Sequence, residues 1–115
     1  MQKYLLLLFF LPVGNLFSQT KINNAQFKEL MKDSMAVILD VRTPEEVTEG
    51  KIDQAINVNY FSATFVDQVE SLIPKNKTVL VYCAAGARSV EACKQLKKAG
   101  YKKLYDLETG YNGWE

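Results

Sequence analysis

The chain has 115 residues, enough for one domain, and its 14 basic and 13 acidic side chains give a formal net charge of +1 at pH 7. This balance excludes a strong general attraction to nucleic acid or to an acidic membrane surface. The lack of histidine excludes histidine-based triads, cysteine–histidine pairs and histidine metal sites, and two cysteines are too few for a four-cysteine zinc site.

Residues 1–18 are predicted to be a cleaved export signal. Lys3 precedes an apolar run over residues 4–11, which Pro12 and small or polar residues up to Ser18 follow, in the order of a signal peptide. The run is far shorter than the roughly 20 residues of a membrane-spanning helix. We therefore expect export, to a bacterial periplasm, without stable membrane insertion after cleavage. An uncleaved anchor and a buried first strand are the alternatives.

Helical and strand patterns alternate along the rest of the chain. Apolar spacing and capping residues predict helices over residues 24–31, 44–49, 65–72 and 89–99. Apolar runs predict strands over residues 36–39, 55–58, 78–82 and 103–107, and residues 110–114 are a loop or a short helix. This alternation predicts an α/β fold with a mostly parallel sheet, in which ligands bind beyond the carboxyl ends of the strands.

The segment VLVYCAAGARS, residues 79–89, places Cys83 at the end of a buried strand. Small residues follow, and a helix begins within a few positions. Backbone N–H groups at a helix start, a glycine that can turn them inward, and the charge of Arg88 would all favour a thiolate or a persulfide anion. We therefore expect Cys83 to be a reactive thiol. The alternative is a small buried hydrophobe that ends a strand.

Cys93 and the pair Asp40 and Arg42 are expected to be structural. Cys93 shares a helical face with apolar residues, so we predict that it lies in the core, and no native Cys83–Cys93 disulfide is expected. Asp40 is expected to accept hydrogen bonds from loop amides, and Arg42 to pair with Glu45 or Glu46. The alternative is that Asp40 and Arg42 reach the Cys83 segment or its substrate.

Three segments resemble the rhodanese-like sulfurtransferase family in its single-domain, exported form. They are LDVRTPEEVTEGKIDQAINV (residues 39–58), VYCAAGARS (residues 81–89) and GYKKLYDLETGYNGW (residues 100–114). The resemblance covers nearly all of the mature chain and assigns residues 22–115 to one rhodanese-like domain. It implies a three-layer α/β fold with a central, mostly parallel five-stranded sheet and helices on both faces.

The resemblance also implies a two-step reaction. The Cys83 thiolate takes the outer sulfur of a donor such as thiosulfate, and the persulfide gives that sulfur to cyanide, a thiol or a protein sulfur acceptor. No metal or organic cofactor is implied. The residues implied to bind the transferred group are Ala84, Ala85, Gly86, Ala87 and Arg88, and those implied to support the site are Asp40, Arg42 and Ser89.

Other functions remain open beside sulfur transfer. A protein of this family can serve as a non-enzymatic sulfur carrier or interaction module. Related phosphatases and arsenate reductases carry five residues between cysteine and arginine, whereas this chain has the four residues 84–87, which favours sulfur over a tetrahedral anion. A thiol–disulfide function is disfavoured because no C-x-x-C pair is present. The loop alanines leave Arg88 as the only charge, so weak thiosulfate turnover is expected.

Overall fold

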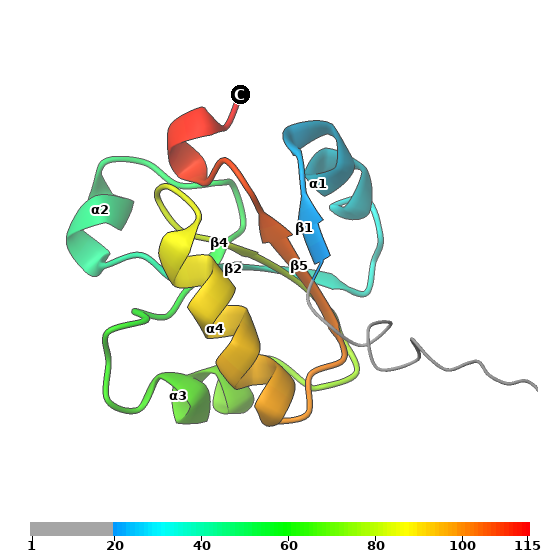
Figure 1. Cartoon of the computed structure of the whole chain (residues 1–115), viewed down its shortest axis with the longest axis vertical. Helices are drawn as coiled ribbons and strands as arrows, with labels where there is room; N and C mark the ends of the chain where they lie inside the picture. The colour runs from blue at the N-terminus through cyan, green and yellow to red at the C-terminus, as the bar shows by residue number, and fades with distance from the viewer. Residues whose placement is uncertain (1–19) are drawn as a thin grey trace, which may run out of the picture.

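The computed structural model describes residues 20–115, and the signal peptide predicted over residues 1–18 lies outside them. Five strands form one parallel sheet in the order β1-β5-β4-β2-β3 (Figure 1). The strands are β1 (Thr20–Ile22), β2 (Ala36–Asp40), β3 (Ile56–Asn57), β4 (Thr78–Tyr82) and β5 (Lys103–Leu107). The helices are α1 (Asn24–Leu30), α2 (Pro44–Thr48), α3 (Phe65–Leu72) and α4 (Ala87–Lys98), with a short 3-10 helix η2 (Tyr111–Gly113).

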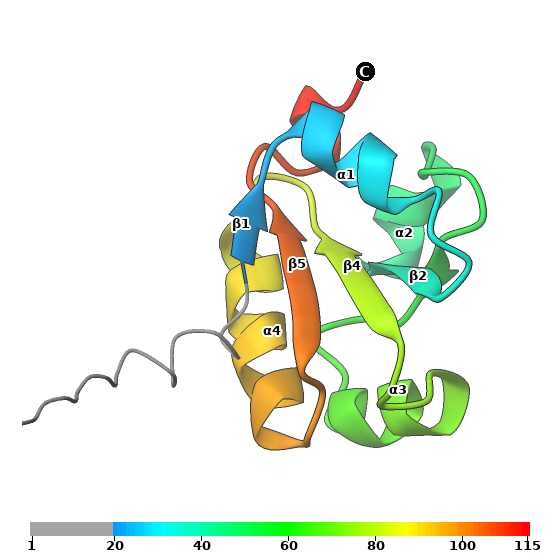
Figure 2. The ribbon, with the colours of Figure 1, turned by 90° about the vertical axis from the view of Figure 1, so that its right-hand side faces the viewer.

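Helices cover both faces of the sheet, which confirms the predicted three layers. In the central strand β4 every residue is buried, so its alternate side chains serve two cores. Val79 and Val81 pack in the cluster that α3 and α4 complete, whereas Leu80 and Tyr82 pack with Phe27 of α1. Figure 2 shows α4 and α1 on opposite sides of the strands.

Local sequence signals account for most element boundaries. Asn23 and Thr43 each form a capping box, at the starts of α1 and α2. The fourth helix begins at Ala87 rather than at the predicted Ser89, because Gly86 adopts φ 101° and turns the chain directly into the helix. Among residues 20–115 no helix is long and apolar enough to cross a membrane.

The strand register brings three strand ends together. Asp40 of β2 lies opposite Tyr82 of β4, and Val81 of β4 lies opposite Asp106 of β5. Cys83 follows β4 directly. Side chains that are far apart in the sequence therefore meet at the carboxyl edge of the sheet, where parallel sheets bind ligands.

Candidate active site

The Cys83 loop, residues 83–88, runs from β4 into the first turn of α4. The Sγ atom of Cys83 accepts hydrogen bonds from the backbone N–H of Gly86 at 3.1 Å and of Ser89 at 3.3 Å. These amides belong to the start of a helix of 12 residues, whose dipole adds a partial positive charge. Amides and a helix start directed at the sulfur are the features from which the sequence analysis expected a reactive thiol, and that reactivity stays a prediction.

The turn that follows β5 packs directly beneath the Cys83 loop. Tyr111 donates its N–H to the carbonyl of Cys83 at 2.7 Å, and Asn112 donates to the carbonyl of Ala84 at 2.9 Å. Gly110 adopts φ 65°, and a Cβ there would lie 2.3 Å from the Ala84 oxygen. The loop therefore holds its shape because a glycine allows this close backbone approach.

Arg88, the only charged side chain of the loop, pairs with Glu46 of α2. The two guanidinium nitrogens NH1 and NH2 donate to Oε1 and Oε2 of Glu46 at 2.7 and 2.9 Å. The hydrogen bond from Arg88 lowers the pKa of Glu46 to about 2 from 4.5. The guanidinium also lies 5.6 Å from the ring centre of Phe61. The sequence analysis named Glu46 only as a possible partner of Arg42 and missed its pairing with Arg88.

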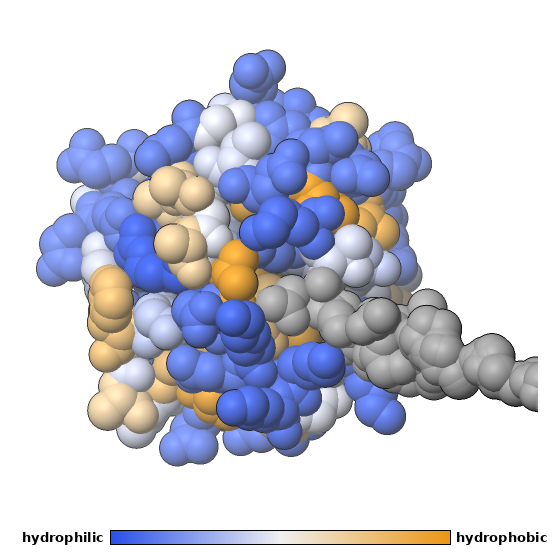
Figure 3. Space-filling view, viewed as in Figure 1, coloured by the Kyte–Doolittle hydropathy of each residue, from blue (hydrophilic) through white to orange (hydrophobic). Residues whose placement is uncertain are grey.

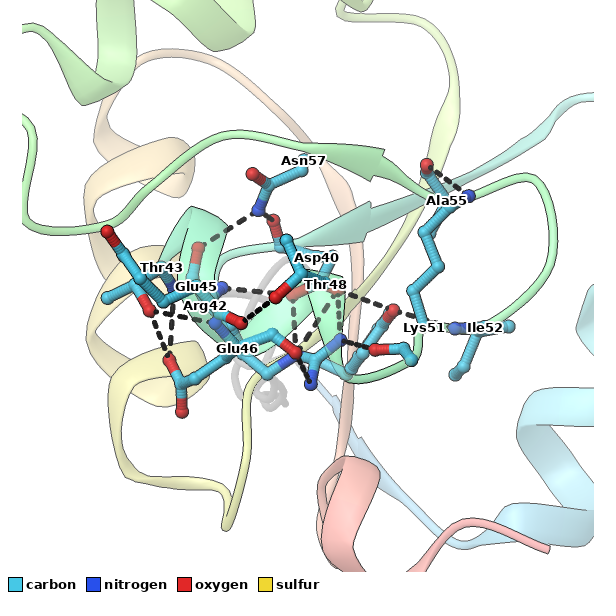
Figure 4. A network of polar contacts seen from close by, with 12 residues as sticks. Asp40, Arg42, Thr43, Glu45, Glu46, Thr48, Lys51, Ile52, Ala55 and Asn57 are labelled. Atoms are coloured by element: carbon cyan, nitrogen blue, oxygen red, sulfur yellow. Dashed lines mark hydrogen bonds and ion pairs between the residues drawn. The ribbon is translucent and has the colours of Figure 1, made fainter.

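Asp40 and Arg42 form a buried network below the loop (Figure 4). Arg42 donates through Nε and NH2 to the Asp40 carboxylate at 3.0 and 2.7 Å, and through NH2 to the carbonyl of Gly50 at 2.7 Å. The prediction that Arg42 pairs with the side chain of Glu45 or Glu46 is wrong. The Arg42 guanidinium forms its ion pair with Asp40, and Glu46 forms its ion pair with Arg88.

The Asp40 side chain supports the strand ends as predicted. Its Oδ1 accepts the backbone N–H of Arg42 at 3.0 Å. Its Oδ2 accepts the hydroxyl of Tyr82 at 2.7 Å, and that hydroxyl accepts the N–H of Ile52 at 3.0 Å. Burial, together with the hydrogen bond to Asp40, raises the pKa of Tyr82. The network ties β2 to β4 and does not contact Sγ.

Ser89 lies under the sulfur and connects it to a carboxylate. The Ser89 hydroxyl accepts a hydrogen bond from Sγ of Cys83 at 3.5 Å. The same hydroxyl donates to Oδ1 of Asp106 at 2.5 Å. Lys21 of β1 donates to the other oxygen of Asp106 at 3.3 Å. Sequence reasoning did not single out Asp106 or Lys21. The available signal was an acidic residue between the apolar residues Tyr105 and Leu107 of a predicted strand.

The remaining predicted residues lie in the loop around Cys83, which is itself only 1% exposed. Ala84 is half-buried, and Ala85 and Ala87 are exposed, so no bulky side chain of the loop stands over the thiol. Cys93 is fully buried on α4, and burial raises the pKa of its thiol. Cys83 and Cys93 are both free thiols. Within residues 20–115 no cluster of three or more acidic or cysteine side chains is arranged to hold a metal ion.

Comparisons with known proteins agree with this geometry. The family model described as rhodanese-like domain matches residues 23–115. The chain is 33% identical over 95 residues to a sulfurtransferase of Allochromatium vinosum, covering 82% of this chain and 86% of that one. It is 36% identical over 85 residues to thiosulfate sulfurtransferase 16, chloroplastic, of Arabidopsis thaliana, covering 66% and 71%.

A solved structure shows the same fold. The crystal structure of a rhodanese-like domain protein from Staphylococcus aureus matches with a TM-score of 0.73 and 28% identity, over 84% of this chain and 92% of that one. The family match over residues 23–115 includes strands β2 to β5, the Cys83 loop and the turn beneath it. The chain therefore belongs to the rhodanese-like domain family.

Proposed function

We propose that this protein is a sulfurtransferase that moves a sulfane sulfur from a donor to a thiophilic acceptor through a persulfide on Cys83. The observation that carries the proposal is the pair of amide hydrogen bonds from Gly86 and Ser89 to Sγ, at the start of α4. They stabilise a sulfur anion beneath a loop of small side chains.

The proposed reaction has two balanced steps. The Cys83 thiolate attacks the outer sulfur of a donor such as thiosulfate, a sulfur–sulfur bond forms on Sγ, and sulfite leaves with the electron pair of the broken bond. Cyanide or a thiolate then attacks the outer sulfur of the persulfide, and the Cys83 thiolate is released. Neither step needs a metal or an organic cofactor.

The charge around the loop supports weak use of thiosulfate. Both terminal nitrogens of Arg88 already donate to Glu46. The charge of Arg88 is therefore neutralised by Glu46, so the loop attracts a dianionic donor less strongly than a free guanidinium would. Donors of lower charge fit this rim better. The four residues between Cys83 and Arg88 favour a sulfur atom over a phosphate, so phosphatase or arsenate reductase activity ranks below sulfur transfer.

A protein thiol is a suitable acceptor. Phe61 is 65% exposed and lies beside Arg88 at the rim of the site, so it offers apolar contact to a partner that brings a cysteine to the loop. The other exposed large hydrophobic residues within residues 20–115 are Met35 and Leu72. On the face drawn in Figure 3 the apolar patches are small and are separated by hydrophilic residues.

Persulfide loading tests the proposal. The protein is treated with thiosulfate and with other sulfane donors, and the Cys83 peptide is weighed by mass spectrometry. The expected result is a gain of one sulfur atom, lost again on addition of cyanide, with no gain in Cys83→Ser. Cys93→Ser serves as the matched control and should load as the wild type does. Absence of loading with every donor overturns the proposal in favour of an interaction module. Aryl phosphate hydrolysis that Cys83→Ser abolishes would instead identify a phosphatase.

We also propose that the protein acts outside the cytoplasm, because residues 1–18 have the pattern of a signal peptide. The mass of the mature protein purified from its native host tests this, because cleavage would remove about the first 18 residues. A full-length chain recovered from the cytoplasm would contradict export.

A further inference from the structure

Asp106 is a buried carboxylate that the sulfur chemistry above does not use. Only 1% of the residue is exposed, and it lies near the end of β5 beside the Cys83 loop. A buried carboxylate is rare unless it is paired. Its partners are the Ser89 hydroxyl and the Lys21 ammonium group, whose side chain is 54% exposed. The negative charge of Asp106 is therefore only partly balanced.

The Ser89 hydroxyl joins this carboxylate to the sulfur. It has one proton, and its shortest contact is the 2.5 Å hydrogen bond to Oδ1 of Asp106, against 3.2 Å to the carbonyl of Gly86. With that proton directed to Asp106, a lone pair of Oγ faces Sγ at 3.5 Å. This arrangement accepts an S–H proton, so it suits the neutral thiol of Cys83 and a charged Asp106.

We propose that Cys83 and Asp106 share one proton through the Ser89 hydroxyl. When the thiolate forms, the S–H bond breaks as a new Oγ–H bond forms, and the original Oγ–H bond breaks as an Oδ1–H bond forms. One negative charge moves from the carboxylate to the sulfur, and no other reactant is consumed. Ser89 then donates to the thiolate, beside the amides of Gly86 and Ser89. Asp106 is thus a positioning residue that acts through Ser89.

The neighbouring charged groups define the balance of this pair. Lys21 faces Asp106 from β1, Glu108 follows it beyond the end of β5, and the Cys93 thiol faces it from α4. On the sulfur side Arg88, which is paired with Glu46, interacts electrostatically with Cys83. Burial raises the pKa of Asp106 while Ser89 and Lys21 oppose that rise, so the carboxyl can accept a proton more readily than an exposed one.

The test measures titration rather than sulfur transfer, although the inference rests on the proposed role of Cys83. The rate of Cys83 alkylation by uncharged iodoacetamide is followed against pH, with the modified peptide quantified by mass. Asp106→Asn should lower the midpoint by about one to two pH units, because a negative charge within about 6 Å of the sulfur is removed. The matched control Glu108→Gln removes an exposed carboxylate nearby and should move the midpoint by less than about 0.3 units.

A double-mutant cycle tests the path through the hydroxyl. In a Ser89→Ala background the Asp106→Asn change should shift the midpoint by less than half as much, because the hydrogen bonds that couple the thiol to the carboxylate are lost. An equal shift in both backgrounds would reduce Asp106 to a through-space charge and overturn the proposal. An Asp106→Asn midpoint that is unchanged, or higher than that of the wild type, overturns it as well.

Lys21→Met keeps the inference falsifiable if Asp106→Asn does not fold, since this side chain is half-exposed. Without the Lys21 ammonium group, less of the negative charge of Asp106 is neutralised, so the pH midpoint of Cys83 alkylation should rise. An unchanged or lower midpoint contradicts the proposal. Persulfide loading is measured on the same samples. A midpoint shift without persulfide loading would contradict the sulfurtransferase function and support the shared proton. Persulfide loading without a midpoint shift would support the sulfurtransferase function and contradict the shared proton.

Discussion

Arg88 and Glu46, 42 positions apart in the chain, form a two-pronged ion pair with N–O distances of 2.7 and 2.9 Å at the rim of the Cys83 loop. Glu46 also accepts the N–H and the hydroxyl of Thr43, so a single carboxylate caps α2 and neutralises the charge of the loop. An ion pair therefore joins the start of α2 to the loop that carries the thiol.

Releasing Arg88 from this pair should improve the use of an anionic donor. In Glu46→Gln the amide oxygen can still cap α2, but the negative charge is gone and the guanidinium is free to attract thiosulfate. We expect kcat/KM for thiosulfate to rise by about threefold to tenfold, as one charge at a screened site allows. Glu45→Gln, at an exposed neighbouring position, is the control and should leave kcat/KM unchanged. A fall in kcat/KM for Glu46→Gln would contradict this role.

The same pair predicts a difference in acid stability. The hydrogen bond from Arg88 lowers the pKa of Glu46 to about 2 from 4.5, so the contribution is present above pH 4.5 and is lost as pH falls from 4.5 through 2. The Glu46 side chain is 34% exposed, and solvent screening reduces the expected contribution to about 1 kcal/mol. Urea denaturation from about pH 6 to about pH 2 should show wild type losing more unfolding free energy than Glu46→Gln. Equal losses in the two proteins would contradict the prediction.

Gly110 should be essential for the shape of the loop. Gly110→Ala would place a Cβ 2.3 Å from the Ala84 oxygen, which must move the loop that carries Cys83. The control Gly100→Ala has a similarly strained φ of 107° but meets only the Lys75 side chain at 3.4 Å. The positive φ should cost each variant about 1–2 kcal/mol of unfolding free energy, and Gly110→Ala should lose more because its Cβ also clashes with backbone atoms. Only Gly110→Ala should slow Cys83 persulfide formation, by at least about tenfold. Wild-type rates in Gly110→Ala would show that the loop tolerates the displacement.

The network of Asp40, Arg42 and Tyr82 should act on stability. Asp40→Asn leaves Arg42, a residue only 3% exposed, without its charged partner, and should cost about 3–5 kcal/mol. Tyr82→Phe removes one hydroxyl from Asp40 and from the N–H of Ile52, and should cost about 1–3 kcal/mol. Urea denaturation at constant m-value measures both. The expected order fails if Asp40→Asn costs less than Tyr82→Phe.

Local sequence patterns were sufficient to predict most of the fold. The capping boxes at Asn23 and Thr43, and the apolar runs of β2 and β4, are signals contained within a few consecutive residues. The position of Cys83 at a strand end and before a helix start follows from such signals as well. Strand β1 was not predicted because it has only three residues, of which Ile22 alone is buried. It forms by pairing with the distant strand β5, which no local pattern indicates.

Which side chains meet was decided by tertiary structure. Arg42 has three carboxylates within four positions, and the sequence favoured Glu45 or Glu46 over Asp40. The fold selected Asp40 because the network is buried, and left Glu46 for Arg88. The contact of Ser89 with Asp106 spans 17 positions, and that of Lys21 with Asp106 spans 85. Sequence alone therefore determined the α/β class and singled out Cys83 as the candidate nucleophile, because periodicity and capping act locally. The charge environment of that nucleophile arose only when parallel strands aligned their carboxyl ends, because register and burial select partners among distant residues.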